Sequence, residues 1–119
     1  MLSHLGMLSW SSEETNTPVN LMAVADPAVD PLIPGGVALL RFTDAVLEGA
    51  PDQIALARVD LNDEVGRAGV VKAAGVIGNF QMMNRVADGT GMPVGPGSRI
   101  RHADLIEQLD LGRLDHTNE

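Results

Sequence analysis

The sequence predicts an all-α fold, in which an antiparallel bundle surrounds one long core helix and an irregular arm precedes it. Apolar residues recur at helical spacing between residues 37 and 112, and no segment alternates polar and apolar residues as a half-buried strand does. The segment from Val65 to Gly91 is the longest stretch compatible with one helix. Its middle, residues 73–78, carries no polar side chain on any face, which predicts a helix enclosed by other elements.

Residues 1–36 are expected to form a Pro-rich arm. Residues 4–10 are compatible with a short helix, but four of the seven prolines lie in the remainder of the arm, between residues 11 and 36. Each proline removes a backbone donor and favours an extended conformation in the preceding residue, so no long helix is expected here. The arm is predicted either to be partly disordered or to bind in a groove, including one on a neighbouring subunit, through Leu21, Met22, Val24, Val29 and Leu32.

A helical domain is predicted over residues 37–112, followed by a frayed tail at residues 113–119. Glycine and proline mark the predicted helix boundaries in this domain, because glycine favours helix ends and proline suits a first helical turn. The second helix is expected to end at Gly66, although Gly66 also fits the first turn of the long helix. The expected boundaries of the successive helices are Val37, Gly49, Pro51, Gly66, Gly91 and Gly112.

Composition excludes several classes of function. The 119 residues include 8 Lys plus Arg and 16 Asp plus Glu, and the resulting net charge of -8 opposes nucleic acid and anionic membranes as partners. No cysteine is present, which excludes disulfides, thiol chemistry and cysteine-ligated zinc. The first ten residues lack a positive leader, and no window reaches the about 18 apolar residues of a membrane span. We therefore expect a cytoplasmic protein.

The candidate ligand-binding residues are Asn84, Arg85 and Asp88, on the C-terminal half of the long helix. Gln81, Arg85 and Asp88 share a helix face at spacings of four and three, and Asn79 points away from it. Arg85 is suited to orient a carboxylate ligand, with Asn84 donating beside it. The alternative, which we favour, is structural: Arg85 pairs locally with Asp88, and Asn84 satisfies buried backbone groups.

Other motifs for chemistry are missing. The histidines His4, His102 and His116 have no helix-ligand spacing, so no metal site is predicted. There is no G-x-S-x-G nucleophile motif. The segment GTGMPVGPG follows a helix instead of joining a strand to a helix, so it is a helix stop and not a phosphate loop. No cofactor is predicted.

The segment NFQMMNRVADGTGMPV, with VGRAGVVKAAGVIG before it, resembles the C-terminal helical part of the carboxymuconolactone decarboxylase and alkylhydroperoxidase D-like superfamily. Members of that superfamily often carry F-N-x-x-N-R-x-A-D-x-x-G-x-P, and Gln81 replaces the usual Asn here. The resemblance extends from Gly36 to Val94 and implies an alkylhydroperoxidase D-like helical bundle that forms homo-oligomers with intermeshing helices. The matching positions are Phe80, Asn84, Arg85, Ala87, Asp88, Gly91 and Pro93.

The peroxidase branch of the superfamily carries Cys-x-x-Cys-x-x-x-His on an earlier helix, and this chain has no cysteine. We therefore expect a non-peroxidatic accessory or small-molecule-binding module, which self-associates through the long helix and the arm. The first alternative is a decarboxylase or lyase acting on a small carboxylated compound, with Arg85 holding the carboxylate and His4, Glu13 or Glu14 as general acid-base. The second alternative is a subunit or fragment completed by a Cys-bearing partner.

Overall fold

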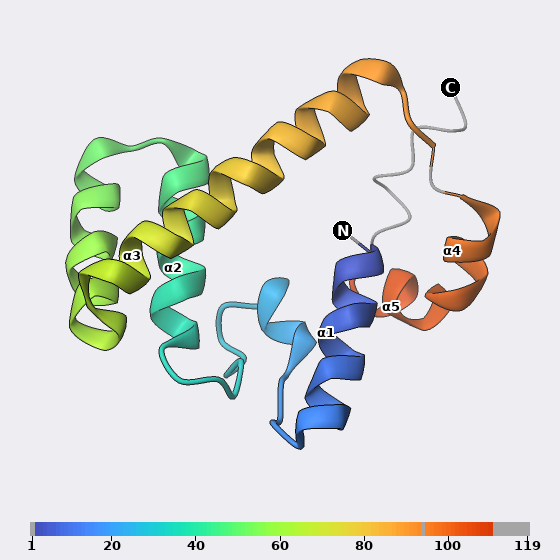
Figure 1. Cartoon of the computed structure of the whole chain (residues 1–119), viewed down its shortest axis with the longest axis horizontal. Helices are drawn as coiled ribbons and strands as arrows, with labels where there is room; N and C mark the ends of the chain where they lie inside the picture. The colour runs from blue at the N-terminus through green and yellow to red at the C-terminus, as the bar shows by residue number, and fades with distance from the viewer. Residues whose placement is uncertain (1, 94, 111–119) are drawn as a thin grey trace. The chain divides into compact units, whose positions relative to one another are not determined.

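The computed structural model describes residues 2–93 and 95–110, and all the regular elements in them are helical (Figure 1). The all-α prediction is confirmed for this part of the chain. The elements are α1 (Leu2–Thr15), the 3-10 helix η1 (Leu21–Val24), α2 (Gly36–Glu48), α3 (Pro51–Thr90), α4 (Pro96–Arg101) and α5 (Ala103–Gln108).

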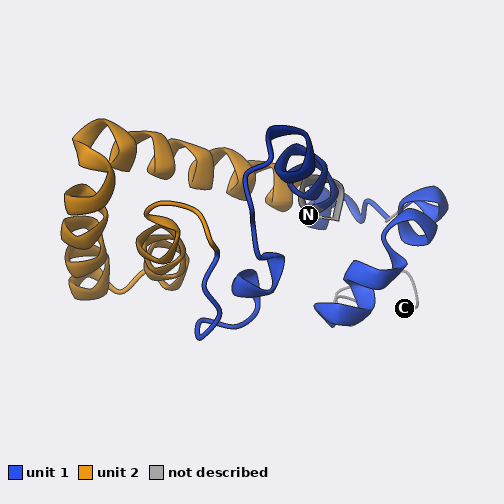
Figure 2. Ribbon diagram, turned by 90° about the horizontal axis from the view of Figure 1, so that it is seen from below, with its two compact units in different colours: residues 1–31, 87–119 blue, residues 32–86 orange. Residues whose placement is uncertain are grey.

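The chain divides into two compact units, shown in different colours in Figure 2. Unit 1 comprises residues 1–31 and 87–119, and unit 2 comprises residues 32–86. The division falls inside α3, between Val86 and Ala87, so this helix belongs to both units. Each unit is described by itself below.

The N-terminal segment is more helical than predicted, since α1 continues five residues beyond Trp10 to Thr15. The prediction of an irregular arm was wrong for this part, because the first proline, Pro18, lies beyond the end of the helix. Serine and threonine side chains satisfy carbonyls near that end: Thr15 Oγ1 donates to the Ser11 carbonyl at 2.7 Å. The irregular segment that follows is interrupted by η1, where Asn20 Oδ1 accepts from the Met22 amide at 3.1 Å.

In unit 2, α2 and α3 share one small hydrophobic core. Helix α2 ends where predicted, at Gly49, whose left-handed backbone lets its amide donate to the Ala45 carbonyl at 3.0 Å. The fully packed residues are Phe42 and Ala45 of α2 with Ala57 and Leu61 of α3. Half-buried residues complete this core: Ala38, Leu39, Val46, Ile54, Val70, Ala73 and Ile77.

A kink at Gly66 divides α3 into a first limb, residues 51–65, and a second limb, residues 67–90. Gly66 has φ 72° and ψ 170°, values that are not helical and that only glycine adopts readily. Of the two alternatives for Gly66, the structure shows the helix break. Gly69 is also needed beside the kink, because a Cβ there would lie 2.5 Å from Val65 Cγ2. The second limb ends at Thr90, next to Gly91, as predicted.

The prediction that residues 73–78 are enclosed was wrong for the described chain. Ala73 and Ile77 pack on the core of unit 2, but Val76 is 55% exposed on another side of the same helix. The sequence shows only that no side chain here is polar. Unit 2 offers α2 and the first limb as cover, and these two segments cover one face of the second limb.

The C-terminal part of unit 1 also differs from the prediction. One short helix was expected, whereas α4 and α5 are separate and His102 lies between them with φ -118° and ψ 25°. His102 packs tightly against α1, since a Cβ on Gly6 would overlap its imidazole ring. The predicted stop at Gly112 and the tail at residues 113–119 lie outside the described residues. In the described part of the chain, no helix is long and apolar enough to cross a membrane.

Candidate functional site

The three candidate ligand-binding residues lie on the last turns of α3, and all are exposed. Asn84, Arg85 and Asp88 each belong to the second limb, and none is packed in the core of unit 2. Asn84 is therefore not positioned to satisfy buried backbone groups, which was part of the structural interpretation. Gln81, which shares their face, is half-buried, and Asn79 is exposed with its Nδ2 donating to Met83 Sδ at 3.8 Å.

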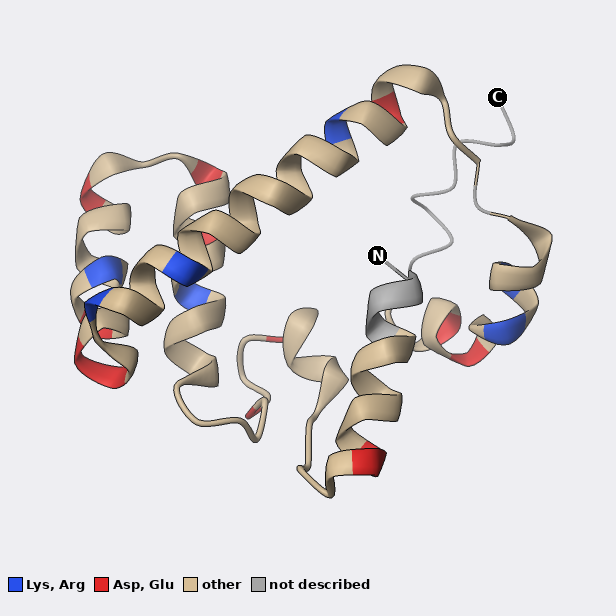
Figure 3. Ribbon diagram, in the orientation of Figure 1, with Lys and Arg blue, Asp and Glu red and all other residues tan. Residues whose placement is uncertain are grey.

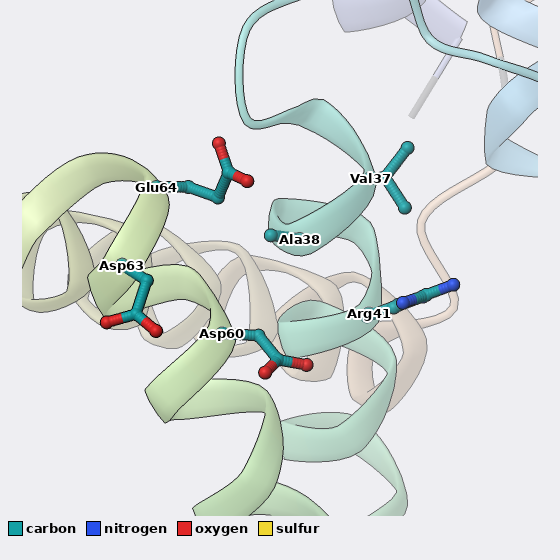
Figure 4. A pocket seen from close by; sticks show the side chains of 6 residues that line it. All are labelled: Val37, Ala38, Arg41, Asp60, Asp63 and Glu64. Atoms are coloured by element: carbon teal, nitrogen blue, oxygen red, sulfur yellow. The ribbon is translucent and has the colours of Figure 1, made fainter.

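Two hollows lie elsewhere, along the groove between α2 and the first limb of α3. The first has a volume of about 300 Å³, and Figure 4 shows Asp60, Asp63 and Glu64 projecting from α3 on one side of it. Val37, Ala38 and Arg41 of α2 form the other side, and the Arg41 side chain extends away from the carboxylates. This hollow is open to solvent, unlike the enclosed clefts that bind small molecules.

A second open hollow, of about 340 Å³, continues the same groove. It shares Arg41 and Asp60 with the first, and its complete lining is Arg41, Asp44, Ala45, Glu48, Gln53, Leu56, Ala57 and Asp60. In each lining three acidic side chains accompany the one basic residue, Arg41, and this excess of negative charge disfavours the small carboxylated ligand predicted from the sequence. Neither hollow includes Asn84, Arg85 or Asp88.

The predicted acid-base residues are not brought to Arg85 by the geometry of either unit. Glu13 and Glu14 are exposed near the end of α1, in unit 1, whereas Arg85 belongs to unit 2. The side chain of His4, like His116, lies outside what the structure describes. Across the described residues, no group of three or more His, Asp or Glu side chains is arranged to hold a metal ion.

Family models, curated proteins and solved structures give no match to this chain. The resemblance of residues 36–94 to the carboxymuconolactone decarboxylase superfamily therefore stays a prediction.

The most distinctive surface of unit 2 is an exposed apolar stripe along the second limb, which the sequence analysis did not single out. The stripe consists of Val71, Gly75, Gly78, Met82 and Val86, all exposed. Spacings of four, three, four and four place these residues within about 80° of the helix circumference, at about 100° per residue. The core-facing residues Val70, Ala73 and Ile77 lie on the opposite side of the helix.

Charged residues are missing from the central part of this limb. Between Lys72 and Arg85 the sequence contains no Lys, Arg, Asp or Glu, and Figure 3 shows this uncharged stretch of α3 between two basic positions. Exposed helix faces of soluble proteins ordinarily carry charged residues. An uncharged face with Val71, Met82 and Val86 exposed by 65%, 60% and 55% is typical of a surface that another element covers.

The sequence predicted an apolar helix that takes part in self-association, but it did not predict which face of the helix is free. Residues 73–78 carry no polar side chain on any side, so the sequence alone does not distinguish a core-facing side from an exposed one. Separating the core-facing residues from the stripe requires knowing that the second limb packs on α2 and the first limb through one side only.

Proposed function

We propose that this chain is a non-peroxidatic accessory module of the carboxymuconolactone decarboxylase type, which assembles into homo-oligomers through α3. The observation that carries the proposal is the exposed apolar stripe on the second limb. The resemblance of residues 36–94 to a superfamily of intermeshing helical oligomers supports the same conclusion. Without cysteine, the chain cannot perform the thiol chemistry of the peroxidase branch.

Self-association would stabilise unit 2 by burying apolar side chains that its own core leaves exposed. Its fully packed core consists of four residues, whereas the stripe leaves three large apolar side chains more than half exposed. Covering each of them contributes about 1 kcal/mol, since full burial of a Val or Met contributes about 1.5–3 kcal/mol. A second copy of the chain gains this energy twice in a symmetric contact.

A binding role fits the described residues better than an enzymatic one. Arg85 is exposed and lines neither hollow, whereas a general acid-base mechanism needs a cleft that places substrate beside both the arginine and a proton-transfer group. The groove rich in Asp and Glu favours solubility and does not attract the carboxylated substrate that the lyase alternative requires.

The proposal is tested by measuring the mass of the protein in solution, with two matched variants. Val71 and Val76 are exposed by 65% and 55% on the same helix, but only Val71 belongs to the stripe. We expect Val71→Glu to remain at the monomer mass of 12.5 kDa, because it places a charge in the contact. We expect the parent protein and Val76→Glu to associate as concentration rises. Sedimentation equilibrium at protein concentrations up to about 1 mM measures this.

A parent protein that stays monomeric over that whole range contradicts self-association. Equal loss of association in Val71→Glu and Val76→Glu, with both variants folded by circular dichroism, contradicts the stripe as the contact surface.

A further inference from the structure

We propose that two copies of the chain pair their apolar stripes in antiparallel orientation, with Val71 of each copy opposite Val86 of the other. The inference rests on the proposed self-association and adds the orientation and register of the partner. The stripe is nearly symmetric about Gly78: Val71 and Gly75 precede it, and Met82 and Val86 follow it. An antiparallel partner therefore places Gly75 opposite Met82.

The distribution of large and small residues favours this orientation. Gly75 and Gly78 occupy the first part and the middle of the stripe, and Met82 lies one helical turn further on. Antiparallel pairing places each Met82 on the bare backbone at Gly75 of the partner copy, so a large residue meets a small one twice. Parallel pairing in register places Met82 on Met82 and Gly75 on Gly75, which leaves a gap at the glycines.

Nothing in the described chain explains why Gly75 and Gly78 are glycine. A Cβ at either position meets no atom within 4 Å, and neither has a positive φ. Glycine inside a helix costs about 1 kcal/mol relative to alanine. By contrast, Gly66 and Gly69 of the same helix are required by backbone conformation and by contact with Val65. A partner helix whose backbone approaches closely at Gly75 and Gly78 would explain why both residues are glycine.

Charges at the two ends of the second limb also favour antiparallel pairing. Arg67 lies near the start of this limb and Asp88 near its end. At about 100° per residue, they lie about 60° and about 120° from the centre of the stripe, in the same rotational direction. Antiparallel pairing in the proposed register brings Arg67 of each copy within about 3 Å, along the helix axis, of the level of Asp88 of the other. Parallel pairing in register leaves Arg67 of one copy about 32 Å along the axis from Asp88 of the other, so this attraction is lost.

The area available matches a reversible dimer. Residues 67–86 form about 30 Å of helix. Packing this length against an identical helix covers on the order of 600 Å² per copy, or about 1,200 Å² in total, the lower end of the range for specific interfaces. The contact therefore suits a second copy of the same limb and predicts association that depends on concentration.

Disulfide cross-linking tests the orientation, because the chain has no cysteine of its own and each introduced thiol is unique. Val71→Cys and Val86→Cys are prepared separately, one of them carrying a mass tag, then mixed and oxidised mildly. We expect the mixture to form at least about ten times more covalent dimer between the two variants than either variant forms with itself, because a disulfide needs Cα atoms about 4.4–6.8 Å apart. Identical residues lie about 22 Å apart along an antiparallel pair.

Val76→Cys mixed with Val86→Cys is the matched control, and it should form no more than background covalent dimer. Efficient cross-linking of Val71→Cys with itself, in a protein that associates in solution, overturns the antiparallel orientation and leaves the proposed self-association standing. A protein that is monomeric by sedimentation and gives only background cross-linking overturns both proposals.

Discussion

At the scale of single residues, Gly66 determines how unit 2 is built. Its backbone, at φ 72° and ψ 170°, turns α3 so that Val70, Ala73 and Ile77 return to the core formed by α2 and the first limb. A Cβ at this position meets no atom within 4 Å, so any effect of a side chain acts through the backbone alone.

We therefore predict that Gly66→Ala lowers the free energy of unfolding by about 1–3 kcal/mol, the cost of holding a non-glycine residue in this conformation. Urea unfolding followed by circular dichroism measures the change. Gly89→Ala is the matched control, because Gly89 lies in the same helix, has no positive φ and is equally free of contacts. Stability in Gly66→Ala at or above that of Gly89→Ala contradicts the kink at Gly66.

At the scale of elements, the pairing of α2 with the first limb of α3 depends on one fully enclosed side chain. Leu61 is 0% exposed and packs with Phe42 and Ala45 of α2. Leu56 lies on the same limb and is 63% exposed. The two leucines thus compare a buried and an exposed position in one helical segment.

We predict that Leu61→Ala destabilises the protein by about 2–5 kcal/mol, since it removes buried methyl groups and leaves a cavity. Leu56→Ala should change the free energy of unfolding by no more than about 0.5 kcal/mol. Chemical denaturation of both variants at equal concentration gives the comparison. If Leu61→Ala leaves no folded protein, Leu61→Met, which keeps the volume, should still fold and cost less than about 1.5 kcal/mol. Equal effects of the two alanine variants would contradict the described core.

The elements that the sequence predicted well are those with local end signals. Helix α2 and the first limb are bounded by Gly49, Pro51 and Gly66, and each of these residues acts through its own backbone. Helix α1 is longer than predicted, because residues 11–15 can continue the helix although they show no helical pattern of apolar residues. The break falls at His102, which packs against Gly6 about a hundred residues earlier in the chain, a contact that no local pattern reports.

The candidate site, too, depends on tertiary contacts that a local sequence pattern does not report. Polarity along one helix was enough to single out Asn84, Arg85 and Asp88, but not to tell whether a cavity adjoins them. The stripe could not be distinguished for a related reason, since a segment that is apolar on every side predicts cover without showing which side the same chain covers. The core-facing side and the exposed side of the second limb are both apolar, and they differ only in which elements pack against them. That difference is a property of tertiary structure.

At the scale of the whole molecule, the proposed assembly predicts that a methyl group added at position 75 raises the free energy of unfolding but weakens association. Gly75 lies in an exposed helical position, so alanine there should raise the stability of the dissociated chain by about 0.5–1 kcal/mol. In the antiparallel pair the same methyl group meets Met82 of the partner copy, and it does so twice.

We predict that Gly75→Ala weakens association at least about tenfold, because overpacking a close contact costs about 1–3 kcal/mol and about 1.4 kcal/mol corresponds to a tenfold change in Kd. Urea unfolding at a concentration where the protein is monomeric measures the first effect, and sedimentation equilibrium measures the second. A variant that is more stable and also associates more tightly would show that Gly75 is not a contact for Met82. Opposite signs require that the partner approaches the backbone at Gly75, because no contact within the described chain opposes the added methyl group there.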